Sequence, residues 1–147
     1  MIFEIKLSRS INFDDPIFDS IRKNYNDFDT WSKRMNKINR PCLILENKNT
    51  NEYECVAILK PCENHRVLKI CTFKVAEKYR KKHLGSQMIK WIKSIVNDDF
   101  QPFDKCYITL FLTSDTAFMP EFLERNEFTL TNIRSNGELV YTYERSV

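Results

Sequence analysis

The fold is decided by residues 67–96, which read VLKICTFKVAEKYRKKHLGSQMIKWIKSIV. The first ten residues, 67–76, predict a strand buried or nearly buried on both faces, because apolar residues occur on both of its sides. From Gly85 onward the sequence predicts an amphipathic helix. Its apolar face would carry Met88, Trp91, Ile92, Ile95 and Val96, and its polar face Gln87, Lys90, Lys93 and Asn97. The stretch is therefore a strand joined to a helix by one short turn.

That turn, EKYRKKHLGS at 77–86, suits an anion. The first amides of a helix lack partners inside it, and the helix dipole adds partial positive charge there. Three consecutive cations, Arg80, Lys81 and Lys82, precede Gly85, one of only two glycines in the chain. Gly85 indicates either a close approach of the backbone to a ligand or a conformation that other residues resist. A phosphate or pyrophosphate is the ligand that this turn suits, whereas the charge alone favours a solvated basic turn without a ligand.

The run Val75 to Ser86, VAEKYRKKHLGS, resembles the acyl-CoA-binding signature of the GCN5-related N-acetyltransferases (GNAT), R/Q-x-x-G-x-G/A between a strand and a helix. The signature starts at Arg80 and keeps its second glycine as Gly85, while His83 replaces the first. Residues 107–128 resemble the next strand and helix of the family. The resemblance covers about the second half of the chain, and the first half follows it by element order.

The resemblance implies an α/β (α+β) fold with a mixed, mostly antiparallel central sheet flanked by helices. It implies acetyl-CoA as cosubstrate and no metal. The backbone of residues 73–75 would pair with the pantetheine arm, and the amides of residues 81–86 would hold the pyrophosphate. The implied cofactor-binding residues are Phe73, Lys74, Val75, Arg80, Lys81, Lys82, His83, Leu84, Gly85, Ser86 and Thr116.

The catalytic residues are not implied in the same way. Where many relatives have a tyrosine as general acid, this sequence has Leu123, and where many have a glutamate it has Lys69. Tyr107 and Tyr141 lie on predicted strands and are candidates for a relocated acid. The expected function is N-acyl transfer from acetyl-CoA to an amine by direct transfer. The alternative is a module that binds acyl-CoA without catalysis.

Composition limits the other possibilities. With 147 residues, 42% of them hydrophobic, we expect a single domain over residues 1–147. A net charge of +3 favours neither a membrane nor nucleic acid, with aminoacyl-tRNA retained only as one acceptor beside small and protein amines. A homodimer is compatible with the resemblance. No leader or membrane-spanning run is evident, so a cytoplasmic protein is expected.

The five cysteines are odd in number and never spaced as CxxC, which favours buried, reduced thiols, none of them a nucleophile.

Trp31 is expected to pack in the core, and His65 to be solvated. Acidic residues around Pro16 predict a helix start, and Asp29 or Thr30 predicts the cap of the next helix. Further strands are expected at 2–9, 41–45, 53–60 and 105–112, further helices at 14–25, 29–36 and 115–126, and a final hairpin at 128–134 and 138–143.

Overall fold

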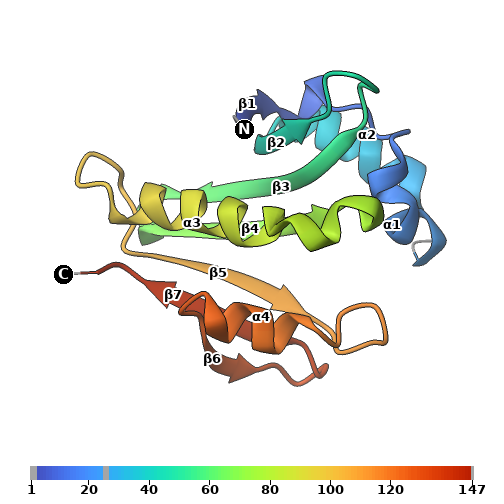
Figure 1. Cartoon of the computed structure of the whole chain (residues 1–147). Helices are drawn as coiled ribbons and strands as arrows, with labels where there is room; N and C mark the ends of the chain where they lie inside the picture. The colour runs from blue at the N-terminus through green and yellow to red at the C-terminus, as the bar shows by residue number, and fades with distance from the viewer. Residues whose placement is uncertain (1–2, 25–26, 147) are drawn as a thin grey trace. The chain divides into compact units, whose positions relative to one another are not determined.

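The structure, a computed structural model, describes residues 3–24 and 27–146 (Figure 1). Its strands are β1 (Glu4–Leu7), β2 (Pro41–Glu46), β3 (Tyr53–Cys62), β4 (Val67–Val75), β5 (Lys105–Leu110), β6 (Thr129–Ile133) and β7 (Leu139–Glu144). Its α-helices are α1 (Asp19–Asn24), α2 (Phe28–Ile38), α3 (Leu84–Asn97) and α4 (Met119–Arg125). This element order is the one that the sequence predicted.

The strands form a seven-stranded sheet in the order β1-β2-β3-β4-β5-β7-β6. The pairs β1–β2, β2–β3, β5–β7 and β6–β7 are antiparallel, and β4–β5 is parallel. The parallel ladder joins Val67–Ile70 to Lys105–Ile108, although β4 itself extends to Val75. The predicted fold class, a mixed and mostly antiparallel sheet with helices, is confirmed.

The chain divides into two compact units, each discontinuous in sequence. The first unit contains residues 1–59 and 72–88, and the second contains residues 60–71 and 89–147. The boundary falls within β4, which gives Val67–Cys71 to the second unit and Thr72–Val75 to the first. That residues 1–147 form one domain stays a prediction.

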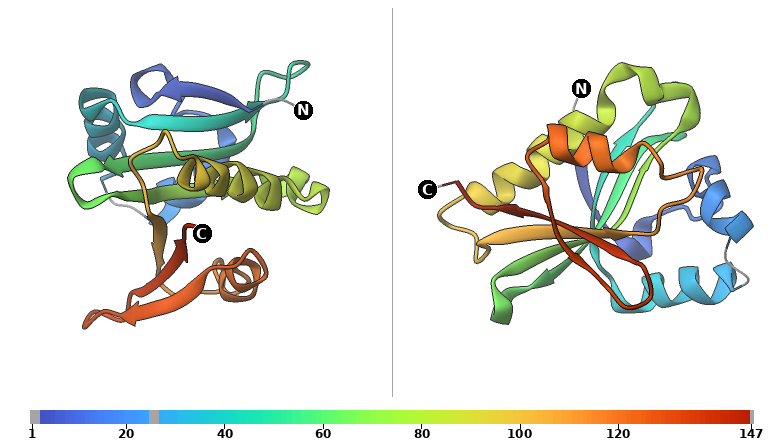
Figure 2. Two further views of the ribbon diagram at one scale, coloured as in Figure 1. Left: turned by 90° about the vertical axis from the view of Figure 1, so that its left-hand side faces the viewer. Right: turned by 90° about the horizontal axis from the view of Figure 1, so that it is seen from below.

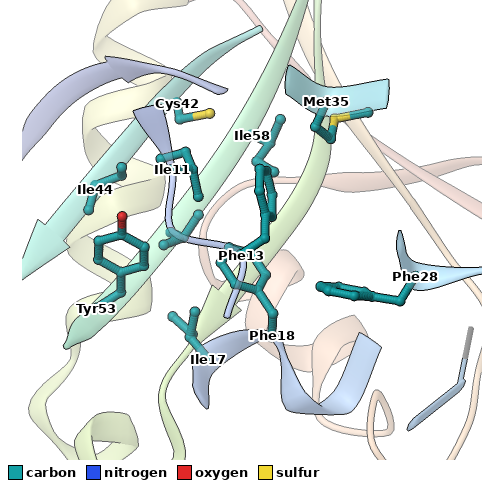
Figure 3. Close-up of a cluster of buried hydrophobic side chains, with 11 residues drawn as sticks. Ile11, Phe13, Ile17, Phe18, Phe28, Met35, Cys42, Ile44, Tyr53 and Ile58 are labelled. Atoms are coloured by element: carbon teal, nitrogen blue, oxygen red, sulfur yellow. The ribbon is translucent and has the colours of Figure 1, made fainter. Parts of the chain in front are cut away.

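Aromatic and aliphatic side chains together form the core of the first unit (Figure 3). The ring of Phe18, which is fully buried, lies 5.1 Å from that of Phe13, centroid to centroid. Trp31 lies edge-on to Phe13 at 5.4 Å and also contacts Phe18 and Phe28. Such ring pairs add to the stability that burial alone provides. The prediction that Trp31 packs in the core is confirmed, although its side chain is only half-buried.

The first two helices begin close to where the sequence placed them. Asp15 accepts hydrogen bonds from the amides of Ile17 (2.9 Å) and Tyr53 (3.0 Å), and a 3-10 turn at Pro16–Phe18 leads into α1. The predicted cap of α2 was wrong, because the helix starts at Phe28 and includes Asp29 and Thr30. Two residues assigned to these first elements, Ile2 and Tyr25, lie outside the described residues.

In the second unit, β7 lies beside β5, and β6 lies beside β7 (Figure 2). The predicted hairpin is confirmed, and Gly137 in its turn has φ +88°, which favours glycine. The helix expected at 115–126 is shorter, because α4 starts at Met119 with Pro120 in its first turn. Phe118, which lies within the expected helix but before α4, is 54% exposed.

Two further expectations need correction. Lys93, placed on the polar face of α3, is buried and donates to the carbonyl of Asn126 at 3.1 Å. β3 continues through Pro61 and Cys62, where the sequence suggested a break. Separately, no helix in the described part of the chain has the length and apolarity needed to cross a membrane.

Candidate functional site

The carboxyl end of β4 leads directly into the basic turn. Phe73, Lys74 and Val75 are half-buried there, and the next amide, that of Ala76, donates to the carbonyl of Glu54 at 2.9 Å. This bond ties the end of β4 to β3. The three residues expected to pair with the pantetheine arm therefore lie on a backbone that is held in place.

The turn itself is a 3-10 segment, Glu77–Lys82, followed by His83 and then α3. Its backbone brings Arg80, Lys81 and Lys82 directly before the amino end of a 14-residue helix. The side chain of Arg80 is exposed. The expected combination of cations and helix-start amides is thus present in one segment.

Tyr79 holds the turn against the connection between β2 and β3. Its side chain is 8% exposed, and its hydroxyl accepts a hydrogen bond from the Asn47 amide at 3.0 Å. The same amide nitrogen donates to Glu54 at 3.1 Å. Lys78 adds an ion pair with Glu52 at 2.6 Å. These contacts fix the basic turn from a segment about 30 residues away in sequence, a feature that the sequence did not reveal.

The left-handed residue of the turn is His83, with φ 58° and ψ 25°. Histidine is among the residues that adopt this region more readily than most. His83 therefore keeps the conformation for which glycine is suited at this place of the signature. Its carbonyl accepts the first bond of α3, from the amide of Gln87 at 3.2 Å.

Gly85 lies inside the first turn of α3 and is buried, as is Leu84, while Ser86 is half-buried. Among the described residues the glycine with positive φ is Gly137. The suggestion that Gly85 adopts a conformation other residues resist was therefore wrong. A close approach of its backbone to a ligand stays a prediction.

Thr116 lies in the other unit, in the loop before α4. Its hydroxyl donates to the carbonyl of Phe111 at 2.5 Å and accepts from the amide of Thr113 at 2.9 Å. These bonds shape the loop from within. The structure thus brings ten of the predicted residues together along 73–86 and leaves the contact of Thr116 with a cofactor as a prediction.

Position 123, where many relatives have a tyrosine as general acid, belongs to the hydrophobic core in this protein. Leu123 is fully buried in α4 and has no proton to give. Of the two alternative tyrosines, Tyr141 is 3% exposed, and burial raises its pKa. Tyr107 is half-buried, and burial raises its pKa most, followed by the nearby Cys62, while the Arg134 guanidinium opposes the rise. Tyr107 is therefore the more accessible phenol of the two.

The five cysteines are all free thiols. Cys42, Cys55 and Cys106 are buried as predicted, whereas Cys62 and Cys71 are only half-buried, so the expectation of burial was wrong for these two. Burial raises the pKa of Cys55 to about 12, and burial likewise raises the pKa of Cys106 to about 12. Neither forms a thiolate near neutral pH, so neither suits nucleophilic attack. Within the described residues, no group of three or more histidine, cysteine, aspartate or glutamate side chains could hold a metal ion.

Solved structures similar to this chain are acetyltransferases. A Desulfovibrio desulfuricans protein assigned to the GNAT family has a TM-score of 0.72 at 11% identity, covering 97% of this chain and 99% of its own. Tetrahymena GCN5 has a TM-score of 0.70 at 10% identity, covering 99% and 97%. The Vibrio cholerae spermidine N-acetyltransferase SpeG, as its F149G mutant, has a TM-score of 0.66 at 12% identity, covering 97% and 93%.

No family model and no curated protein matches the sequence. The structural likeness nevertheless spans nearly the whole chain. The protein has the fold of the GNAT acetyltransferases, which confirms the fold that the signature at residues 75–86 implied.

Proposed function

We propose that this protein is an acyl-CoA-dependent N-acyltransferase that transfers an acetyl group from acetyl-CoA to an amine. The observation that carries the proposal is the turn from Glu77 to His83. It places three consecutive basic residues before the amino end of α3 and is fixed by Tyr79. Helix amides beside cations form a favourable environment for a pyrophosphate. The GNAT fold supports the same function.

Binding would rely mainly on the backbone. The amides of residues 81–86 would donate to the pyrophosphate, because the amides before Gln87 precede the first intrahelical bond of α3. The backbone of Phe73–Val75 would pair with the pantetheine arm. Arg80, Lys81 and Lys82 would add positive charge. In this arrangement most of the side chains are replaceable as long as the backbone conformation is kept.

The bound acyl-CoA would supply the thioester whose acyl group passes to the amine. The amine nitrogen forms the new C–N bond as the C–S bond breaks, the amine loses a proton, and the thiolate leaves. Holding both reactants in place contributes strongly to such a reaction, since effective molarities reach about 10⁵ M or more in well-oriented systems. Leu123 gives no proton, so water or the amine itself would protonate the thiolate.

Calorimetry tests the binding step. CoA and acetyl-CoA are each titrated into the protein, and saturable binding below millimolar concentration is expected. Absence of saturable binding of both ligands at millimolar concentration would overturn the proposal.

The pH dependence of transfer tests the mechanism. With a panel of amines and thiol release as the readout, kcat/KM is expected to rise with pH as the amine loses its proton, without a falling alkaline limb. A bell-shaped profile whose alkaline limb disappears in Tyr107→Phe would identify Tyr107 as the acid. The corresponding result for Tyr141→Phe is not expected, because Tyr141 is buried.

The second candidate function is an acyl-CoA-binding module without catalysis. The burial of Leu123 favours it, since that position serves packing. The two functions differ in one outcome. Saturable binding of acetyl-CoA with no transfer to any amine and no change in hydrolysis would favour the binding module.

A further inference from the structure

The parallel pair β4–β5 carries a cation and a phenol side by side on one face. Lys69 and Tyr107 are register partners, and the Lys69 ammonium lies 5.7 Å from the centroid of the Tyr107 ring. Both side chains are half-buried. The residues that follow them, Ile70 and Ile108, point to the opposite face and are buried. Lys69 and Tyr107 therefore belong to the more accessible face of this part of the sheet.

A second cation approaches the same phenol. Burial raises the pKa of Tyr107 most, and the positive charge of Arg134, which follows β6, opposes that rise. Arg134 also pairs with Glu138, nitrogen to oxygen at 2.7 Å. A lysine of β4 and an arginine that follows β6 thus both act on Tyr107, in the second unit.

Of the two cations near Tyr107, Arg134 has a carboxylate partner and Lys69 has none among the described residues. Glu138 pairs with Arg134, whereas within residues 3–24 and 27–146 the structure gives Lys69 no carboxylate within ion-pair distance. A partly desolvated cation is less stable without an anion, and a charge-assisted hydrogen bond to a carboxylate would compensate for the lost hydration. The site is therefore suited to a ligand that brings its own anion.

Lys69 lies on the strand that is expected to bind the acyl donor. It precedes Phe73 by four residues on β4, and residues separated by an even number along a strand share a face. It also lies one residue before Ile70, where the ladder to β5 ends. Lys69 thus belongs to β4, the strand whose last three residues are the proposed pantetheine contact.

We propose that the acceptor is an amine that carries a carboxylate, such as an amino acid or a peptide with a nearby acidic group, and that Lys69 binds this carboxylate. This inference rests on the proposed function. Polyamines would be poor acceptors, because Lys69 and Arg134 repel additional positive charge.

Two acceptors that share the same amine but differ in their carboxylate test the effect of the carboxylate alone. Glycylglycine ends in a carboxylate, and glycylglycinamide carries a neutral amide in its place. We expect kcat/KM for glycylglycine to exceed that for glycylglycinamide by about tenfold, the order of one charge-assisted hydrogen bond. Spermidine is expected to be slower than both, compared at equal concentrations of unprotonated amine.

The variant Lys69→Gln should bring the ratio between the two dipeptides close to one, and Lys69→Arg, which keeps the charge, should retain a preference for glycylglycine. The control is Lys90→Gln, because Lys90 is an exposed lysine of α3 and should leave the ratio unchanged. Equal rates with both acceptors in the parent protein, or an unchanged preference in Lys69→Gln, would overturn the inference.

A binding measurement keeps this test separate from the test of catalysis. Glycylglycine and glycylglycinamide are titrated into the CoA-saturated protein, which has no acyl group to transfer. Tighter binding of glycylglycine that is lost in Lys69→Gln supports the inference even if no transfer is found. Equal binding of the two dipeptides, in protein that does bind CoA, overturns it while leaving the proposed cofactor site intact.

Discussion

The turn between β4 and α3 and the helix α4 each depart from the GNAT pattern at one position, with different consequences. In the turn, His83 replaces a glycine and still adopts the left-handed conformation. In α4, Leu123 stands where a tyrosine is common and is fully buried. Binding through backbone amides survives a change of side chain, because the amides stay. Acid catalysis by a side chain does not, because the group itself is lost.

Truncation of Leu123 gives the largest expected effect and tests whether this position serves packing in the core. Leu123→Ala should lower the free energy of unfolding by about 2–5 kcal/mol, as for other fully buried leucines. Urea denaturation measures the change. The matched control is Glu124→Ala at the exposed neighbouring position, expected to change stability by less than about 0.5 kcal/mol. Equal effects of the two changes would mean that Leu123 faces a vacant site.

Charge reversal in the basic turn tests whether its cations contribute to CoA binding. Arg80→Glu should weaken CoA binding by at least about tenfold, because it replaces an attraction to phosphate with a repulsion. Calorimetry at two salt concentrations should show a larger difference at low salt. Lys37→Glu on α2 is the control for a general change in net charge. If both variants bind CoA equally well, the basic turn is only a solvated segment.

Tyr79→Phe tests whether the fixed conformation of the turn matters for binding. The change removes the acceptor of the 3.0 Å bond from Asn47 and should cost about 1 kcal/mol of stability. The affinity for CoA should fall several-fold. Tyr143→Phe is matched to it, since Tyr143 is also buried and bonds to Asn97 at 2.8 Å, but in the second unit. That variant should lose stability without losing CoA affinity, and equal losses of affinity in both would contradict the role of Tyr79.

His83→Gly should have the smallest effect. Glycine relieves the left-handed conformation, but it also makes the unfolded chain more flexible, so stability should change by less than about 1 kcal/mol and CoA binding should persist. His83→Val should be the more destabilising of the two, because a β-branched residue is strained at φ 58°. Thermal unfolding with and without CoA provides both readouts. A clear loss of CoA affinity in His83→Gly would show that the imidazole itself contacts the ligand.

Much of the fold followed from local patterns. Strands β4 and β7 could be predicted because their apolar residues recur at short spacing. The hairpin turn could be predicted from its turn residues, and Gly137 has the positive φ that the turn requires. The start of the fourth helix was expected at residue 115, because Ser114 and Asp115 are of the residue types that commonly cap a helix, whereas α4 begins at Met119 with Pro120 in its first turn. When two helix-start signals lie within six residues of each other, the sequence alone does not decide which one starts the helix, because the choice depends on the packing around them.

The candidate site was predictable only along residues 73–86. Its cations and its helix start are neighbours in sequence, so a single motif revealed them. The bond between Asn47 and Tyr79 joins residues 32 positions apart, and the charge of Arg134, which follows β6, acts on Tyr107 of β5. Contacts of this kind depend on strand pairing and leave no mark in a local pattern.

The buried position of Lys93 has a consequence for chemical modification. Acyl-CoA thioesters acylate exposed lysine side chains slowly without any enzyme, so a protein that binds acyl-CoA is exposed to labelling by its own ligand. The nitrogen of Lys93 is enclosed by the carbonyl of Asn126 at 3.1 Å and the carboxylate of Glu127 at 2.6 Å, with 11% of the side chain exposed. An amine that already donates to two oxygens and is shielded from solvent is a poor nucleophile. On incubation with acetyl-CoA, Lys93 should stay unmodified while exposed lysines such as Lys90 and Lys37 accumulate acetyl groups. The contact between α3 and the residues that follow α4 would therefore be spared.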